Sequence, residues 1–190
     1  MEALNLLRKY GDKGYIGEDV TQIEHAFQCA MLAEDHCKKI DIPIKTDFIL
    51  GCLFHDIGHL LCYDNPKLKR MGDYGTMDHE KVGSEYMRSL GFSETVCELV
   101  GNHINTKRYL ISVNPDYYNK LSDASKKTYE YQGGKLTDKE IYNFRNDRLF
   151  NYHLKLREFD ERAKSTESTL LEKIKKMDRD NYFNRYIHDK

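Results

Sequence analysis

An all-α, single-domain fold is predicted by three observations on this sequence. Apolar residues recur with helical spacing almost throughout, whereas no alternating pattern is long enough to indicate a strand. Only three prolines and twelve glycines interrupt the chain. Its 190 residues are the length of one domain, and folding a chain of this size buries roughly 70% of its surface. We therefore expect one helical bundle with a substantial core.

Four helices are expected in the N-terminal part of the chain. Asp78 and Ser93 each stand directly before a run with helical periodicity, as N-cap residues do, because their short side chains accept hydrogen bonds from free backbone N–H groups. Gly91 is expected to end the third helix, since glycine readily adopts the left-handed conformation found after helices. The second helix is dense in apolar residues, which indicates a central position. The expected helices cover about 19–39, 45–61, 78–91 and 93–110.

Two further helices are expected in the C-terminal part. Thr137 and Glu140 have the Thr-x-x-Glu spacing of a capping box, so a long helix is expected to begin there and to run through Arg162. A highly charged helix is expected at about 167–178. The segment 115–135 between these regions shows the least regular pattern and is rich in tyrosine.

Composition and charge exclude several classes of protein. The chain has 30 basic and 31 acidic residues, and this balance gives no electrostatic basis for binding nucleic acid or an anionic membrane. The N-terminus is charged where a signal peptide is apolar, and the longest apolar run, Phe48–Phe54, is too short to span a bilayer. Five cysteines, an odd number without a CxxC pair, indicate reduced thiols. We expect a cytoplasmic protein.

The segment FHDIGH, residues 54–59, places three polar side chains in an apolar helix. His55 and His59 are four residues apart and share one helical face. Asp56 falls on the apolar stripe of the same helix, where an unpaired carboxylate costs several kcal/mol unless it finds a cation, a metal ion or strong donors. Taken alone, the segment also fits a helix end with a hydrogen-bonded histidine and a salt-bridged aspartate.

Further candidate ligands fall on the inner faces of other expected helices. Together they make four histidines and two aspartates on five helices, and a bundle can offer such a set to metal ions. Imidazole and carboxylate without thiolate favour iron, manganese or zinc, and the spacing does not choose among them. Two adjacent metal ions suit either phosphoester hydrolysis or dioxygen activation. One site would take His25, His55, Asp56 and Asp160, and the other His79 and His103 with Asp56 as a bridge.

These residues resemble a known family. His25, the pair His55–Asp56 and Asp160 resemble the H…HD…D pattern of the HD-domain superfamily, whose domains are helical bundles. The inserted His79 and His103 resemble its mixed-valent diiron oxygenase branch, to which myo-inositol oxygenase also belongs. We therefore expect a single HD domain over residues 1–190, with a charged helical tail at about 164–190. Over about residues 14–163 the chain is similar to the PhnZ-type phosphonate oxygenases of that branch, in the segments Tyr15–His25, Leu53–His59, Gly72–Glu94, Lys107–Leu110 and Leu121–Gly134.

The resemblance implies an oxidative reaction on a hydroxyphosphonate. Dioxygen, the co-substrate, would oxidise the hydroxylated carbon of (R)-2-amino-1-hydroxyethylphosphonate, and C–P scission would release glycine and phosphate. The sequence carries neither a GxGxxG nor a P-loop motif, and the branch needs no flavin, haem or nicotinamide because the substrate supplies the electrons. A phosphonate alpha-hydroxylase is the expected pathway partner. Two iron ions in the mixed-valent Fe(II)/Fe(III) state would be held by His25, His55, Asp56, His79, His103 and Asp160.

Eight further positions match catalytic, substrate-binding or supporting residues of the branch. Tyr15 and Glu18 match a mobile gate, in which the tyrosine can occupy an iron position and the glutamate meets the substrate ammonium. Gln22 and Lys81 are expected to orient metal ligands. A phosphonate dianion needs charge-assisted donors. Those expected here are His59, Lys107, Ser125 and Arg157, of which His59 and Lys107 share the catalytic role with the gate residues.

Three alternatives remain open. The first is an HD-type metal-dependent phosphohydrolase, which the H…HD…D pattern alone favours but which would not need His79, His103 or the Tyr15–Glu18 segment. The second is a binding module without turnover, which is disfavoured because every ligand position is filled. The third is the same oxygenase chemistry on hydroxymethylphosphonate or on 1-hydroxy-2-(trimethylammonio)ethylphosphonate. Glu18 favours a primary ammonium, since a trimethylammonium group donates no hydrogen bonds and usually prefers an aromatic cage.

Overall fold

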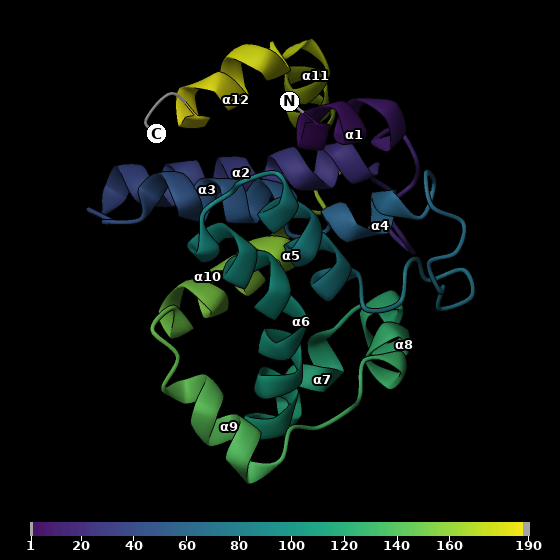
Figure 1. Ribbon diagram of the computed structural model, residues 1–190, viewed down its shortest axis with the longest axis vertical. Helices are drawn as coiled ribbons and strands as arrows, with labels where there is room; N and C mark the ends of the chain where they lie inside the picture. Colours follow the sequence, from purple (N-terminus) through teal and green to yellow (C-terminus); the bar gives the residue numbers. More distant parts are fainter. Residues whose placement is uncertain (1, 188–190) are drawn as a thin grey trace.

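The computed structural model describes residues 2–187, and this part of the chain is built from α-helices without a strand. Figure 1 shows the helices in chain order, and they confirm the all-α prediction. The helices are α1 (Glu2–Tyr10), α2 (Gln22–Lys39), α3 (Lys45–Phe54), α4 (Ile57–Leu61), α5 (His79–Ser89), α6 (Glu94–Val113), α7 (Pro115–Lys120), α8 (Asp123–Tyr131), α9 (Asp138–Arg145), α10 (Phe150–Arg162), α11 (Ser168–Lys176) and α12 (Arg179–Ile187).

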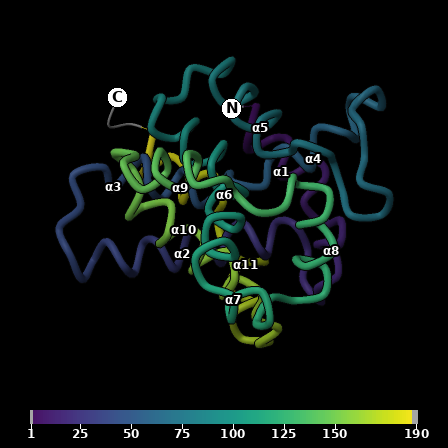
Figure 2. The backbone as a smooth tube through the Cα atoms, turned by 90° about the horizontal axis from the view of Figure 1, so that it is seen from below, coloured from purple at the N-terminus to yellow at the C-terminus, as the bar shows by residue number. Residues whose placement is uncertain are grey.

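Helices α2 and α3 lie side by side across the middle of the molecule (Figure 1). Helices α1, α11 and α12 pack against this pair on one side. On the other side α5 packs against α6, while α10 contacts α2, α3 and α6, and α7, α8 and α9 flank the far half of α6 (Figures 1 and 2). Within residues 2–187, no helix combines the length and the apolar character needed to cross a bilayer.

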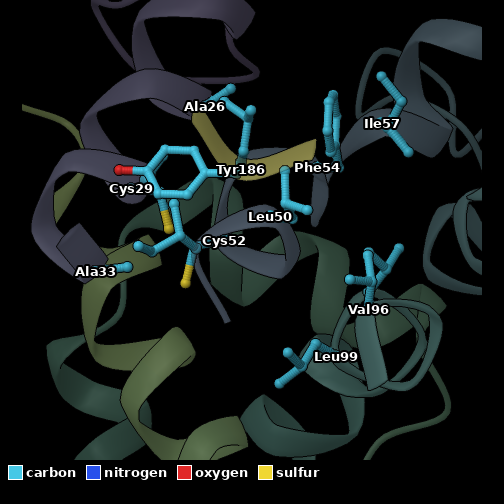
Figure 3. Packing of buried hydrophobic residues seen from close by; sticks show 14 of the residues in the cluster. Ala26, Cys29, Ala33, Leu50, Cys52, Phe54, Ile57, Val96, Leu99 and Tyr186 are labelled. Atoms are coloured by element: carbon cyan, nitrogen blue, oxygen red, sulfur yellow. The ribbon is translucent and has the colours of Figure 1, made fainter. Parts of the chain in front are cut away.

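The main core lies between α2, α3 and α6, and Figure 3 shows side chains from these helices directed toward one another. Phe27, Phe48 and Leu99 are fully buried in it. Both ends of the described chain contribute, because Leu4 of α1 and Phe183 of α12 are 2% and 1% exposed. The segment expected as a charged helical tail at about 164–190 forms α11 and α12 within residues 168–187, and both helices contribute side chains to the core.

The prediction of one continuous helix over 45–61 is wrong in one respect, because the helix is interrupted between Phe54 and Ile57. At the interruption Asp56 has φ −100° and ψ 10°, which turns the chain out of the α-helical path. Gly58 explains how closely the second piece approaches α5: a Cβ built on this glycine would stand 1.9 Å from the carbonyl oxygen of His79. The change of direction places the HD pair at the start of α4 and against the start of α5.

The helix-start predictions have mixed outcomes. Ser93 accepts a hydrogen bond from the N–H of Val96 and caps α6 as expected, and Gly91 has the expected left-handed φ of 79°. Asp78 occupies the expected N-cap position of α5, and its carbonyl oxygen accepts a hydrogen bond from the N–H of Val82, but its own φ is 52° and its carboxylate makes no capping hydrogen bond. The carboxylate instead accepts from Lys81 Nζ at 2.7 Å. A residue in the left-handed conformation does not aim its side chain at the helix N–H groups.

The expected long helix from Thr137 through Arg162 is two helices, α9 and α10. The capping box at Thr137 is confirmed. The chain leaves the helix after Arg145, and a turn follows in which the N–H of Leu149 donates to Asp147 Oδ1 at 2.7 Å. This turn lets α9 cover a small second apolar cluster at the end of α6. The irregular segment 115–135 contains the short helices α7 and α8.

Replacing Gly58 by alanine should destabilise the protein by about 2 kcal/mol, because the added methyl group overlaps backbone atoms of α5 that cannot rotate away. Urea unfolding of the metal-free protein measures this loss. Gly14→Ala is the matched control, since a Cβ at Gly14 meets no atom within 4 Å and should change the free energy of unfolding by only a few tenths of a kcal/mol. Equal midpoints for the two variants would show that the close approach is not needed.

Candidate metal centre and substrate pocket

Four buried histidines form two pairs at the centre of the molecule. His25 of α2 and His55, which follows α3, place their Nε2 atoms 3.1 Å apart. His79, the first residue of α5, and His103 of α6 place their Nε2 atoms 3.0 Å apart. None of these side chains is more than 3% exposed. Four separate segments thus deliver imidazoles to one place.

Backbone carbonyl groups fix the protonation of three of these imidazoles. The Nδ1 atoms of His25, His55 and His103 lie 2.7–2.9 Å from carbonyl oxygens, which belong to Ala163, Cys52 and Val100 respectively. A carbonyl oxygen only accepts, so each Nδ1 carries a proton and each neutral ring presents a lone pair at Nε2. In the first pair two such lone pairs face each other at 3.1 Å. That contact is repulsive unless a cation, either a proton or a metal ion, lies between them.

The carboxylate of Asp56 lies between the two pairs. Its Oδ2 is 3.3 Å from Nε2 of His55 and 3.6 Å from Nε2 of His25. Its Oδ1 is 3.2 Å from Nε2 of His103 and 3.4 Å from Nε2 of His79. One oxygen therefore faces each pair, so Asp56 could contribute a ligand atom to a metal ion at each.

A second carboxylate, that of Asp160 on α10, closes the first cluster. Its Oδ1 lies 3.4 Å from Nε2 of His25 and 3.7 Å from Nε2 of His55. Its other oxygen accepts a hydrogen bond from Nη1 of Arg157 at 2.7 Å. Arg157 is also bound at Nε by Glu161, 2.9 Å away. The guanidinium is thus held on both sides and in turn directs Oδ1 of Asp160 toward the imidazoles.

The electrostatics of this cluster favour bound cations. Burial alone would raise the pKa of Asp56, but positive charge on the facing imidazoles, that of His55 first, holds it well below its usual range. Burial alone would raise the pKa of Asp160 as well, but the charge of Arg157 and the contacts with His25 and His55 together hold it well below its usual range. Burial alone would lower the pKa of His55, but the charge of Asp56 and the contact with Asp160 act with the other nearby groups to raise it well above its usual value. Two buried carboxylates therefore attract positive charge to the Nε2 side of the imidazoles.

The six side chains fit two metal ions. Adjacent ligand atoms around an ion with bonds of about 2.1 Å stand about 3 Å apart, which is the separation of the facing Nε2 atoms. Two groups of mutually close ligand atoms are present in the described chain, and they share Asp56. Nitrogen and oxygen donors without sulfur suit iron, manganese or zinc. The groups are His25, His55 and Asp56, and Asp56, His79 and His103.

A pocket opens directly over this cluster. Lys107 is 2% exposed there, and its Nζ donates to Thr128 Oγ1 at 3.0 Å and to the carbonyl oxygen of Ser125 at 3.4 Å. Burial, and after it the charge of Arg157, lowers the pKa of Lys107 to about 7. Arg157, the carboxylates of Asp56 and Asp160 and the side chain of Ser125 line the same pocket.

His59 adds a neutral donor to the pocket wall. Its Nδ1 accepts a hydrogen bond from the N–H of Thr76 at 3.1 Å, so the proton of the neutral ring is on Nε2. The ring stacks on His79 with centroids 3.7 Å apart. Burial and then the nearby charge of His79 lower the pKa of His59 well below its usual value, which keeps the ring neutral. His59 is thereby fixed next to a candidate ligand with its N–H available.

The expected gate residues lie in the loop that precedes α2. The ring of Tyr15 stacks on His25 with centroids 3.9 Å apart. Burial and the charges of Asp56 and Asp160 raise the pKa of Tyr15 well above its usual value, so the hydroxyl stays protonated. Glu18 also lines the pocket, but its carboxylate is bound by Lys164 Nζ at 2.6 Å.

The two expected supporting residues are placed differently from each other. Gln22 is 6% exposed and lines a small cavity that also reaches Asp56. The side chain of Lys81 is 69% exposed, and its Nζ pairs with Asp78. The structure therefore does not give Lys81 the orienting position that was expected.

Three residues of the site were missed in the sequence. Thr76 and Thr128 act through single hydrogen bonds to His59 and Lys107, which leave no pattern in a sequence. Lys164 stands just beyond the segment that resembles the oxygenases. Its one available signal was its position next to Ala163, at the end of the helix that carries Asp160.

Comparison with known proteins places the chain among a small set of relatives. Residues 23–180 match the family model described as HD domain. An uncharacterized protein of Acanthamoeba polyphaga mimivirus is 40% identical over 161 residues, which cover 85% of this chain and 70% of that protein. The hydroxymethylphosphonate dioxygenase of Gimesia maris is 37% identical over 161 residues, or 84% of this chain and 75% of that enzyme. The 1-hydroxy-2-(trimethylamino)ethylphosphonate dioxygenase (glycine-betaine-forming) of Leisingera caerulea is 33% identical over 154 residues, which cover 81% of this chain and 74% of that enzyme.

Removing the shared carboxylate should empty both metal positions, whereas removing a ligand of one group should empty one. Elemental analysis of protein purified without oxygen should find two irons per chain in the native protein, about one in His103→Ala and close to none in Asp56→Ala. Lys81→Ala is the control and should keep both, since this side chain lies outside the cluster. Two irons retained in Asp56→Ala would contradict the bridging position.

Proposed function

We propose that this chain, which belongs to the HD-domain family and to its branch of phosphonate dioxygenases, cleaves the carbon–phosphorus bond of a 1-hydroxyphosphonate with dioxygen at a diiron centre. The membership itself confirms the resemblance seen in the sequence and makes the chain an oxygenase of C–P compounds. The observation that carries the finer proposal is the second imidazole pair, His79 and His103, on the far oxygen of Asp56. A single-metal hydrolase has no use for that pair.

The residues of the centre would hold the metal ions, and their neighbours orient these ligands. Two iron ions bound there would supply dioxygen activation and the one-electron chemistry that oxidises the hydroxylated carbon. The carbonyl acceptors behind His25, His55 and His103 keep Nε2 free for a metal and fix each ring plane. Arg157 keeps Asp160 ionised and aimed at the first pair. The chain thus enters the reaction with its ligands already in place.

The pocket supports binding of a phosphonate. Lys107, Arg157 and the Nε2–H of His59 bring two positive charges and a neutral donor to the space over the metal cluster. A phosphonate dianion matches these donors. Its negative charge would raise the pKa of Lys107, which is about 7 in the protein without substrate, and so favour the charged form of this lysine. The hydroxyl and one phosphonate oxygen would then face the metal positions.

The reaction balances without another cofactor. Hydroxymethylphosphonate and dioxygen contain all the atoms of formate, phosphate and one proton, and the 2-amino substrate gives glycine in place of formate. Dioxygen takes up the electrons that the carbon and the broken C–P bond release, so no nicotinamide or flavin is needed. A phosphonate alpha-hydroxylase, which would supply the hydroxylated substrate, is the pathway partner that we propose.

A direct test is oxygen-dependent phosphate release by iron-loaded protein prepared without oxygen. We expect phosphate to appear from a 1-hydroxyphosphonate only after oxygen is admitted, with one phosphate formed for each dioxygen consumed. The assay includes hydroxymethylphosphonate, the 2-amino and the trimethylammonio compounds, and an ordinary phosphomonoester. Phosphate released from the phosphomonoester without oxygen, and from none of the phosphonates, would move the chain to the hydrolases.

The pH dependence of kcat/KM should reveal Lys107. Because burial lowers the pKa of Lys107 to about 7, the ammonium is charged below that pH and becomes neutral as the pH rises through it. We therefore expect kcat/KM for a hydroxyphosphonate to fall above about pH 7. In Lys107→Arg the guanidinium stays charged, so the fall should move to higher pH even if the rate itself is lower. An unchanged alkaline limb in that variant would assign the titration to another group.

A further inference from the structure

The ion pair between Glu18 and Lys164 lies in the wall of the proposed substrate pocket, which both residues line. Nζ of Lys164 is 2.6 Å from Oε1 of Glu18, and the two side chains are only 19% and 18% exposed. Glu18 is the residue expected to meet a substrate ammonium. In this structure the chain itself already provides an ammonium at that carboxylate.

The backbone on both sides of Lys164 is held in place. Ala163 donates its N–H to the carbonyl oxygen of Phe159 at 2.8 Å, and its own carbonyl accepts from Nδ1 of the ligand His25. Ser165 exchanges two hydrogen bonds with the side-chain amide of Gln28, at 2.9 and 3.0 Å. Lys164 therefore starts from a fixed point next to the metal cluster and is not a loosely attached surface lysine.

The partner side of the ion pair is also positioned. The turn that carries Glu18 is closed by its N–H, which donates to the carbonyl oxygen of Tyr15 at 3.1 Å. Gly17 in that turn has a φ of 72°, and a Cβ there would stand 2.6 Å from Cβ of Ala124, so the turn lies against α8. Nζ of Lys164 is also 5.9 Å from the centroid of the Tyr15 ring, within the range of a cation–π contact.

We infer that Lys164 is a specificity residue, which occupies Glu18 and so selects hydroxyphosphonates without a cationic tail over those that carry one. The inference rests on the proposed function and names the substrate class within it: small dianions such as hydroxymethylphosphonate. A substrate ammonium must either displace Lys164, which leaves a mostly buried ammonium without its partner, or share Glu18 with it beside two more cations, Lys107 and Arg157. A substrate without an ammonium disturbs none of these contacts.

The test compares kcat/KM for hydroxymethylphosphonate and for 2-amino-1-hydroxyethylphosphonate in native protein and in Lys164→Met. The native protein should prefer hydroxymethylphosphonate. In the variant, the ratio of kcat/KM for the amino substrate to kcat/KM for the hydroxymethyl substrate should rise about tenfold, which is the effect expected from one partly buried ion pair. Lys155→Met is the matched control, because Lys155 makes an ion pair of the same 2.6 Å length with Glu158 on an exposed face of α10. It should leave the ratio unchanged.

A second variant shows whether the gain depends on the freed carboxylate. Adding Glu18→Gln to Lys164→Met should return the ratio toward the native value. Binding without oxygen gives a readout separate from turnover: calorimetry with 2-aminoethylphosphonate and ethylphosphonate should find tighter binding of only the amino compound in Lys164→Met. Iron content, measured in parallel, should be the same in every variant.

The outcomes distinguish failure of the specificity role of Lys164 from failure of the proposed function. Oxygen-dependent phosphate release with a substrate ratio and binding that Lys164→Met does not change overturns the specificity role and leaves the proposed function standing. Equal losses for both substrates would instead make Lys164 a phosphonate ligand, which also overturns it. If no hydroxyphosphonate is turned over, the proposed function fails, and the inference that rests on it falls with it.

Discussion

The position of one carboxylate, that of Asp56, constrains the rest of this structure. Its two oxygens each face a pair of imidazole nitrogens at 3.2–3.6 Å, so the segments that carry the four histidines must all meet at this side chain. The helix before it ends at Phe54, and the chain turns at Asp56 before α4 begins. Gly58 then lets α4 pass within contact of the α5 backbone. The interruption thus lies at the residue around which the four histidines gather.

Contacts one layer further out position the side chains of this centre. Carbonyl groups hold the outer nitrogens of three histidines, and Arg157, itself held by Glu161, directs Asp160. The core formed by α2, α3 and α6 lies behind these groups, with α1 and α12 packed on its other side. The helices at the ends of the described chain therefore support the centre although they contribute no ligand to it.

What the sequence predicted well is what depends on residue type and spacing. Helical periodicity was enough to bring the six candidate ligands to inner faces, and the resemblance selected one chemistry for them. The sequence did not predict features that depend on backbone conformation. Asp78 is the N-cap residue of α5, but its left-handed φ keeps its carboxylate from capping the helix, and the 45–61 pattern contains no sign of the turn at Asp56. Lys164 was missed because its role arises from a contact with Glu18, 146 residues away in the chain.

We propose that Asp56 bridges two iron ions into a magnetically coupled pair. Spectroscopy of the iron-loaded, partly oxidised protein tests this proposal most directly. A bridging carboxylate couples the spins of the two ions, so electron paramagnetic resonance should show the signal of a coupled mixed-valent pair, and Mössbauer spectra should show equal amounts of ferrous and ferric iron. The signal of isolated ferric ions, with no coupled species, would mean that the two imidazole pairs hold two independent metal ions or a single one. Either result would contradict the bridging role of Asp56.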